Sequence, residues 1–395
     1  MKRILILGAG FLQSFVIKRA RELGYYVIAI DKNQTSPGFI EANESAVIDI
    51  IDQEACLSYA KKKKIDGVMT AATDYGVLTT AYIAKEMDLP GLDYEVAKKI
   101  KNKYLIRKQL SNEIKPSMSQ YYEVDSLERL EELRERIPYP VMVKPCDGSG
   151  SRAIGKVENF EELVGACKEA MESSLQKKAL VEEFIEGREY GADVFVYQGE
   201  IYNIGILKKK MTMPPIYAEL GHSFPSGLEN IGETVVTIKK AIKALGINYG
   251  AVNLDFLVTK KGEVCIIDLG ARLGGNLISS HILSLGTGQD YMGIAIKSAV
   301  GDPVEIGEGR EEKAVATRIL ALTPGRVVKI PDIPFIEHQF GVTILHTMKV
   351  GDLIRQYHTN LDGCGYVLAV AKHVREARQN ATMAKQYIDA HIIRE

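Results

Sequence analysis

Short apolar runs alternate with amphipathic stretches along residues 1–93. The runs cover residues 3–7, 26–30, 46–50 and 67–70, and the stretches between them repeat apolar residues at helical spacing. Short apolar runs that end in Gly or Asp are typical of buried strands. This alternation predicts a parallel, doubly wound sheet with helices on both faces, ending where Pro90-Gly91 breaks the chain.

The pattern changes beyond residue 93. Residues 94–110 are predicted to form one helix, with six cations on a solvated face, and residues 119–184 indicate strand, helix, strand, Gly-rich loop, strand, helix and strand. A hairpin turning at Gln198-Gly199, an irregular loop at 208–225, a helix at 230–245 and a second hairpin follow. Residues 304–395 are strand-rich and close with a helix at 374–391. The predicted fold class is α/β, in part α+β.

Two aspartates mark the second hairpin. Its strands, 250–258 and 263–268, are joined by a turn with Lys260-Lys261-Gly262 at the tip. Antiparallel pairing brings Asp255 and Asp268 close together, which costs stability unless a cation lies between them. Mg²⁺ typically binds one or two carboxylates and substrate phosphates. Arg272 follows four residues later, where a guanidinium can stabilise developing negative charge. The alternative is a surface hairpin with solvated aspartates.

A loop of small residues follows a lysine in another predicted strand. Lys144 lies in the strand 141–145, and the loop 147–155 consists largely of Gly and Ser. Such residues let backbone N–H groups approach a phosphate closely. The loop is not the GxxxxGK[ST] phosphate loop, because the lysine precedes the glycines. A purely structural turn is the alternative.

The first turn of the chain carries an incomplete dinucleotide fingerprint. Its pattern is Gly8-x-Gly10-x-x-Gln13, with Asp31 at the end of the next strand, and the third glycine is replaced. We favour a turn that packs, or that meets a substrate at the helix N-terminus. An NAD-dependent oxidoreductase is kept as a rival hypothesis.

Composition and charge exclude several classes of function. The net charge of −1 gives no excess of positive charge for binding nucleic acid or an anionic membrane. No apolar run approaches the roughly 18 residues that span a bilayer. The five cysteines have no metal-site spacing and are typical of buried thiols in a reducing compartment, so a cytoplasmic location is predicted.

The glycine loop, the acidic hairpin and their order along the chain together resemble the ATP-grasp superfamily. The resemblance is greatest to the branch with glycinamide ribonucleotide synthetase, biotin carboxylase, carbamoyl phosphate synthetase and the L-amino acid ligases. It implies a Rossmann-like pre-ATP-grasp domain at 1–93 and a two-part ATP-grasp clamp at 94–302, with a mobile lid at 115–182. A small C-terminal β-rich domain at 303–395 completes the implied architecture.

The resemblance also implies roles for individual residues. The implied ATP contacts are Lys103 of the motif Asn102-Lys103-x-x-x-Arg107, Lys144, Gly148, Ser149, Gly150, Ser151, Glu182, Glu183, Phe184 and Ile185 at the adenine, and Glu189 at the ribose. The implied metal ligands for Mg²⁺, or for Mn²⁺ in its place, are Asp255 and Asp268. The implied catalytic residues are Arg272 and Lys144. The implied substrate contacts are Glu219, His222, Arg272, Gly274, Gly275 and Asn276.

One position departs from the pattern of the family. The family commonly has Glu-x-Asn-x-Arg, whereas this chain has Asp268-Leu269-Gly270-Ala271-Arg272. Gly270 stands where the family often has a third metal ligand. Whether the site binds one metal ion or two therefore stays open. The segment Glu219-x-x-His222-x-x-Pro225-Ser226 is most similar to the amino-acid ligases, although by pattern alone His222 is equally a loop histidine without a role.

The implied reaction is ATP-dependent amide formation. A carboxylate attacks the γ-phosphate of ATP to give an acyl phosphate and ADP, and an amine then displaces phosphate. The expected partners are a small carboxylate, for which an amino acid is favoured, an amine and a second copy of the chain in a homodimer. Carbamoyl- or carboxyphosphate chemistry and phosphoribosylamine–glycine ligation stay open within the fold. A regulatory protein with a degenerate nucleotide clamp is the alternative of another class.

Overall fold

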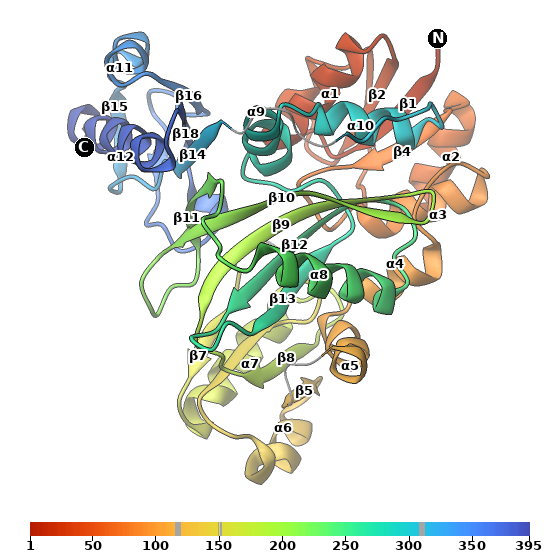
Figure 1. Ribbon diagram of the computed structural model, residues 1–395, viewed down its shortest axis with the longest axis vertical. Helices are drawn as coiled ribbons and strands as arrows, with labels where there is room; N and C mark the ends of the chain where they lie inside the picture. The colour runs from red at the N-terminus through yellow and green to blue at the C-terminus, as the bar shows by residue number, and fades with distance from the viewer. Residues whose placement is uncertain (115–119, 149, 151, 308–312) are drawn as a thin grey trace.

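The computed structural model describes residues 1–114, 120–148, 150, 152–307 and 313–395. Figure 1 shows three lobes around a central antiparallel sheet: the N-terminal lobe in red and orange, a small lobe in yellow and the C-terminal lobe in blue. None of the helices in the described part of the chain has the length and apolar character that crossing a bilayer requires.

The N-terminal lobe is built on a parallel sheet with the strand order β3-β2-β1-β4. Its elements are β1 (Arg3–Leu7), α1 (Phe11–Glu22), β2 (Tyr26–Asp31), β3 (Glu44–Val47), α2 (Gln53–Lys63), β4 (Gly67–Thr70) and α3 (Val77–Glu86). Ile4 to Leu7 are completely buried, because helices cover both faces of the sheet. The predicted parallel, doubly wound sheet is confirmed.

The single helix predicted for residues 94–110 is wrong. The chain forms α4 (Tyr94–Ile100) and α5 (Lys103–Glu113), and the Asn102 side chain between them accepts the backbone N–H of Leu105 at 3.1 Å. This N-cap starts a new helix. The break turns Lys103 and Arg107 inward, where they are 8% and 3% exposed instead of lying on a solvated face.

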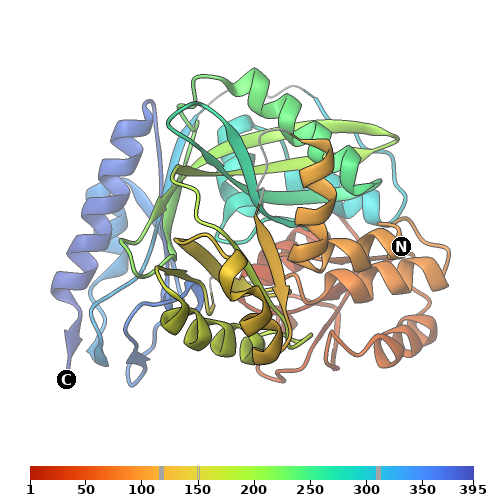
Figure 2. The same cartoon turned by 90° about the horizontal axis from the view of Figure 1, so that it is seen from below.

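The small lobe contains a four-stranded sheet with the order β5-β8-β6-β7. Its elements are β5 (Tyr121–Val124), α6 (Leu127–Leu133), β6 (Val141–Pro145), β7 (Gly155–Val157), α7 (Phe160–Ser173) and β8 (Ala179–Glu183). The predicted succession is confirmed. Both helices share one core with the sheet, built on Leu130, Leu163 and Val143, and Figure 2 shows the lobe from below. The predicted lid also includes residues 115–119, which lie outside the described residues.

The central sheet has eight strands in the order β13-β12-β9-β10-β11-β14-β18-β16. Its middle part contains β9 (Arg188–Tyr197), β10 (Glu200–Met211), β11 (Glu219–Phe224), β12 (Gly250–Val258) and β13 (Val264–Gly270), with α8 (Ile231–Leu245), α9 (Leu283–Thr287) and α10 (Tyr291–Ala299) packed around them. The irregular loop predicted at 208–225 is wrong, because most of it belongs to β10 and β11. Lys209, between Lys208 and Lys210, is buried, as the two-residue alternation of a strand requires.

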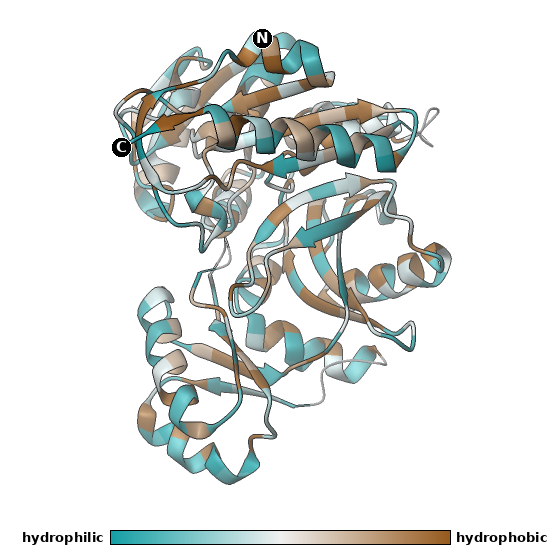
Figure 3. Ribbon diagram, turned by 90° about the vertical axis from the view of Figure 1, so that its left-hand side faces the viewer, coloured by the Kyte–Doolittle hydropathy of each residue, from teal (hydrophilic) through white to brown (hydrophobic). Residues whose placement is uncertain are grey.

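Three C-terminal strands, β14, β18 and β16, continue the same sheet, because β11 pairs with β14, while β17, β15 and β19 form a small sheet of their own. The elements are β14 (Ala314–Ile319), β15 (Gly325–Lys329), α11 (Ile333–Phe340), β16 (Val342–His346), β17 (Leu353–Ile354), β18 (Gly365–Ala371), α12 (Val374–His391) and β19 (Ile393–Arg394). Helix α11 was not predicted; Asp332 caps its first turn. In Figure 3 hydrophobic residues concentrate along the strands and the inward faces of the helices.

Candidate active site

A cavity of about 710 Å³ lies where the lobes meet. The predicted residues that line it are Lys103, Lys144, Gly148, Gly150, Glu182, Glu183, Phe184, Ile185, Glu189, Glu219, Asp255, Asp268, Arg272, Gly275 and Asn276. Ser149 and Ser151 lie outside the described residues. His222 and Gly274 do not line the cavity. Residues from 103 to 276 in the sequence are therefore gathered around one space.

One buried carboxylate, that of Glu182, holds the cations Lys144 and Arg107 on one side of the cavity, here called the lysine side. The Glu182 oxygens bind Lys144 Nζ at 2.5 Å and Arg107 Nε at 2.7 Å. Burial alone would raise the pKa of Glu182, but the two cations outweigh it and hold the pKa below its ordinary value. Burial lowers the pKa of Lys144, although Glu182 opposes this. Both Glu182 oxygens thus bind cations, and the side chain supports Lys144 at the wall of the cavity.

The two hairpin aspartates are directly opposite each other in the β12–β13 register. Asp268 forms an ion pair with Lys103, and Asp255 Oδ2 lies 2.7 Å from Lys209 Nζ. Burial opposes ionisation of Asp268, but Lys103 and Lys144 lower its pKa to about 2. Burial raises the pKa of Asp255, and the nearby charges of Glu219 and Asp268 add to this while Lys209 opposes it.

This pair of carboxylates suits Mg²⁺ in its chemistry. Both line the cavity and offer hard oxygen ligands on facing strand positions. Within the described ranges no group of three or more His, Cys, Asp or Glu side chains is arranged to hold a metal. A cation here would therefore complete its shell with oxygen atoms of water or of a bound phosphate.

Arg272 is held by residues from two lobes. Its Nε and Nη2 donate to Oδ1 and Oδ2 of Asp74 at 3.0 and 3.2 Å, and Nη1 donates to Asn253 Oδ1 at 2.9 Å. Burial opposes the charge, but Asp74 outweighs it and raises the pKa of Arg272. The guanidinium stays cationic at the wall of the cavity.

A polar network closes the end of the cavity near the C-terminal lobe. Glu219 accepts from Lys209, from Asn276 Nδ2 and from Asn360 Nδ2, the last at 3.2 Å. Tyr366 donates its hydroxyl to Asn276 Oδ1 at 2.8 Å. The lobe that follows the clamp in sequence therefore supplies part of the wall.

Two predicted substrate residues lie behind the wall. His222 is completely buried, and its Nε2 is 3.7 Å from Glu219 Oε2. Gly274 donates its backbone N–H to Ser279 Oγ at 2.5 Å, and a Cβ there would meet Asn253 and Asp193 at 3.0 Å. Both positions support neighbours of the cavity and do not face it.

Asp193, which is buried behind Asn253 and Gly274, is expected to make the stability of the fold depend on pH. It is completely buried and accepts from Asn253 Nδ2 at 2.7 Å and from Ser279. Burial, partly offset by these bonds, raises its pKa from 3.8 to about 6. Between pH 4 and 6 the folded chain then holds a proton that the unfolded chain has lost, so stability falls as pH rises.

The loss across this window is about 3 kcal/mol for a shift of roughly two pKa units. We expect the free energy of unfolding in urea of the wild type, minus that of Asp193→Asn, to fall by this amount from pH 4 to pH 6. The subtraction cancels the contributions of titrating groups that the substitution leaves unchanged. A difference that is flat from pH 4 to pH 6 would contradict the assignment.

The N-terminal turn is filled by its own side chains. Asp31 Oδ2 accepts the backbone N–H of Ala9 at 2.8 Å. Gln13 packs against Gly8 and Gly10 and donates to the Ala71 carbonyl at 2.7 Å. The acid and the glycines that suggested a dinucleotide therefore stabilise the turn itself, which supports the packing interpretation.

Among the wall residues that the sequence analysis did not predict, four form hydrogen bonds or ion pairs with predicted site residues: Asp74, Lys209, Asn360 and Tyr366. Lys209 lies in a strand whose alternation could have placed it inward, but the lysine run was interpreted as part of a loop. Asp74, Asn360 and Tyr366 come from lobes far away in sequence, and no local signal identifies them.

Comparisons with known proteins agree with this arrangement. Residues 137–280 match the ATP-grasp domain family, and residues 318–392 match L-amino acid ligase C-terminal domain 2. Dapdiamide A synthase of Enterobacter agglomerans is 22% identical over 410 residues, which cover 98% of this chain and 94% of that protein.

Two solved structures share the whole fold. L-amino acid ligase from Bacillus licheniformis has a TM-score of 0.87 and 22% identity, covering 100% of this chain and 99% of that chain. Phosphoribosylglycinamide synthetase from Anaerococcus prevotii has a TM-score of 0.78 and 26% identity, covering 100% of both chains. The domain matches and the shared architecture lead to one conclusion: the chain contains an ATP-grasp domain followed by an L-amino acid ligase C-terminal domain, and it has the fold of the ATP-grasp ligases.

Proposed function

We propose that this protein joins a small carboxylic acid, with an amino acid as the first candidate, to an amine at the expense of ATP. The supporting observation is the single cavity in which Lys103, Lys144, Asp255, Asp268 and Arg272 converge. Phosphoryl transfer needs positioning and charge neutralisation more than covalent help from the protein. This set of charges matches that need.

ATP is proposed to lie between the small lobe and the β12–β13 hairpin. Lys103 and Lys144 neutralise phosphate oxygens, while the segment 182–185 and Glu189 line the part assigned to adenine and ribose. Asp255 and Asp268 would hold Mg²⁺, which the superfamily generally uses and which supplies further neutralisation of phosphate charge. Ordering of the small lobe over the nucleotide excludes water from the acyl phosphate.

Arg272 is proposed to face the reacting carboxylate. Its guanidinium stabilises the negative charge that develops as the acyl phosphate forms and as the amine attacks it. Glu219 and Asn276 lie at the same end of the cavity. A carboxylate next to an amide suits an ammonium group, which favours an amino acid as a substrate.

We further propose Mg²⁺ with Mn²⁺ as a working substitute, a homodimer, and a reducing compartment such as the cytoplasm, because all five cysteines are free thiols. The boundaries 1–93, 94–302 and 303–395, with the lid at 115–182, are kept as proposed domains. Light scattering of the purified chain tests the dimer, and a monomer at micromolar concentration would contradict it.

The test of the function is a screen for ADP release. Pairs of carboxylic acids and amines, with the amino acids in both roles, are incubated with ATP and Mg²⁺, Mn²⁺ or EDTA. We expect ADP release that needs both the acid and the metal, and mass spectrometry should find the amide. Omitting the amine should leave only slow ADP release, from hydrolysis of the acyl phosphate.

Three outcomes separate the hypotheses. Release of ADP with bicarbonate alone favours carboxyphosphate chemistry. Nucleotide binding without ADP release for every pair favours a regulatory protein with a degenerate clamp. Quenching of NADH fluorescence on titration, together with no ATP-dependent thermal shift, supports the oxidoreductase instead.

A further inference from the structure

The space beside Gly270 is already occupied by another lobe. A Cβ at position 270 would lie far inside the van der Waals distance of Asp74 Oδ1, and 3.3 Å from Arg272 Nε. Gly270 has no left-handed backbone angle, so conformational freedom does not account for the glycine. The Asp74 carboxylate stands where a side chain at position 270 would begin.

That carboxylate grips Arg272 with both oxygens. The two bonds, 3.0 Å from Nε and 3.2 Å from Nη2, have the parallel geometry of a bidentate pair, and the partners are 14% and 21% exposed. Such a pair fixes the plane of the guanidinium as well as its position. Asn253 then holds the remaining edge through Nη1.

Asp74 is itself fixed from both sides of its loop. The preceding residues pair with the chain just beyond Arg272: Ala71 bridges to Leu273, and Ala72 donates its N–H to the Leu273 carbonyl at 3.0 Å. Lys101 Nζ donates to the Asp74 carbonyl at 3.0 Å. The loop of Asp74 and the segment of Arg272 are therefore joined directly by backbone contacts.

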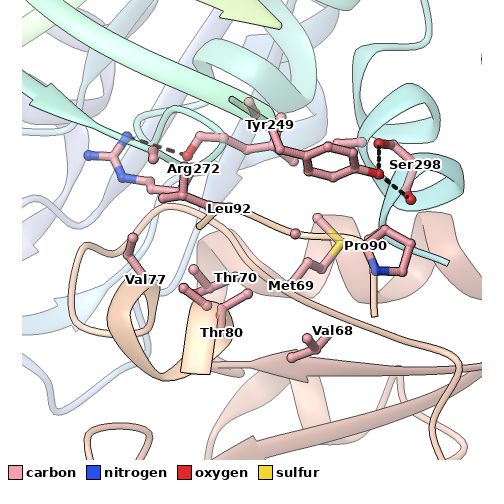
Figure 4. A pocket seen from close by; sticks show the side chains of 18 of the residues that line it. Val68, Met69, Thr70, Val77, Thr80, Pro90, Leu92, Tyr249, Arg272 and Ser298 are labelled. Atoms are coloured by element: carbon pink, nitrogen blue, oxygen red, sulfur yellow. Dashed lines mark hydrogen bonds between the residues drawn. The ribbon is translucent and has the colours of Figure 1, made fainter. Parts of the chain in front are cut away.

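An apolar contact between the lobes adds to this connection. A small cavity of about 70 Å³, lined mainly by apolar residues of β4, α3, β12 and α10, lies next to it. Figure 4 shows the Arg272 guanidinium at one end and Tyr249, hydrogen-bonded to Ser298, at the other. Apolar side chains of the N-terminal lobe and of the central sheet therefore face each other beside Asp74 and Arg272.

We infer that Asp74 is the positioning residue of Arg272, and that Gly270 is small so that this carboxylate from the N-terminal lobe can enter the site. The inference rests on the proposed function for the role of Arg272. The N-terminal lobe is then part of the catalytic arrangement and not only a wall for substrate.

A double-mutant cycle tests the inference. Asp74→Ala removes the grip, and Gly270→Ala displaces the carboxylate, so each should lower the turnover number for ADP release by about 10- to 100-fold with little change in KM for ATP. Because both act on one contact, Asp74→Ala/Gly270→Ala should be no slower than the slower single variant. Gly232→Ala, which adds its methyl in open space, is the matched control.

A second double-mutant cycle, measured by the melting temperature, tests the contact between Asp74 and Arg272 and needs no enzymatic activity. Asp74→Ala and Arg272→Ala should each lower the melting temperature, and the double variant should melt no lower than either single one. If the wild type releases no ADP with any pair, the proposed function fails, while this cycle still decides whether Asp74 holds Arg272. Additive losses in the melting cycle, or multiplied losses in turnover, would overturn the inference.

Discussion

Asp268→Asn is expected to lower the rate of ADP release by about 10²- to 10³-fold, the loss typical when one preorganised electrostatic contribution to the transition state is removed. The substitution removes the carboxylate that faces Asp255 and leaves Lys103 without its acid. Its pKa of about 2 keeps Asp268 ionised at every working pH, so the wild type always presents this charge.

Single-turnover assays with a productive acid and amine pair measure the effect. Glu263→Gln is the matched control, because Glu263 is an exposed acid at the turn of the same hairpin and does not line the cavity. We expect the control to keep wild-type turnover and both variants to keep the wild-type circular dichroism spectrum. Near wild-type ADP release by Asp268→Asn would remove Asp268 from the proposed metal site.

Glu182→Ala is expected to destabilise the fold by about 3–5 kcal/mol, the usual cost of removing one partner from a buried ion pair. Glu182 is 2% exposed and is the shared acid of Arg107 and Lys144. Without it, two cations with 3% and 9% exposed side chains would repel each other with little screening by water.

Urea denaturation at neutral pH measures this loss. The control is Glu132→Ala, which removes an acid of the same lobe from a helical pair with Arg129 whose side chains are 65% and 45% exposed. Exposed pairs of this kind contribute roughly 0–1 kcal/mol. If Glu182→Ala cost no more than the control, the claim that Glu182 organises the lysine side would be wrong.

Local pattern was sufficient for most elements near the site. The period-two hairpin placed Asp255 opposite Asp268, and the helix at 374–391 is found with the predicted bounds. Local pattern failed where a polar side chain is stabilised by a distant partner. The lysine run at 208–210 predicts a loop, because a lysine is rarely buried without an acid beside it. The two acids that pair with Lys209 are Glu219 and Asp255, and both lie in other strands, later in the sequence.

The same limit explains the N-terminal glycines. The turn has most of a dinucleotide fingerprint, and only the structure shows that Asp31 and Gln13 use their polar groups within the lobe. The glycines of the fingerprint show that the backbone can form a tight turn. They do not show whether a ligand or a side chain of the protein occupies the space beside that turn.

The sequence by itself determined most of the succession of strands and helices, the acidic hairpin, the glycine loop and the resemblance to a family, because periodicity, turn residues and motif spacing act over short stretches of chain. Only the tertiary structure decided which charges meet. The pairing of Glu182 with Arg107 and Lys144, the placing of Lys209, and the entry of Asp74 beside Gly270 join residues 10 to 198 positions apart. Such contacts depend on how lobes pack, and packing sums many weak contacts that no local pattern records.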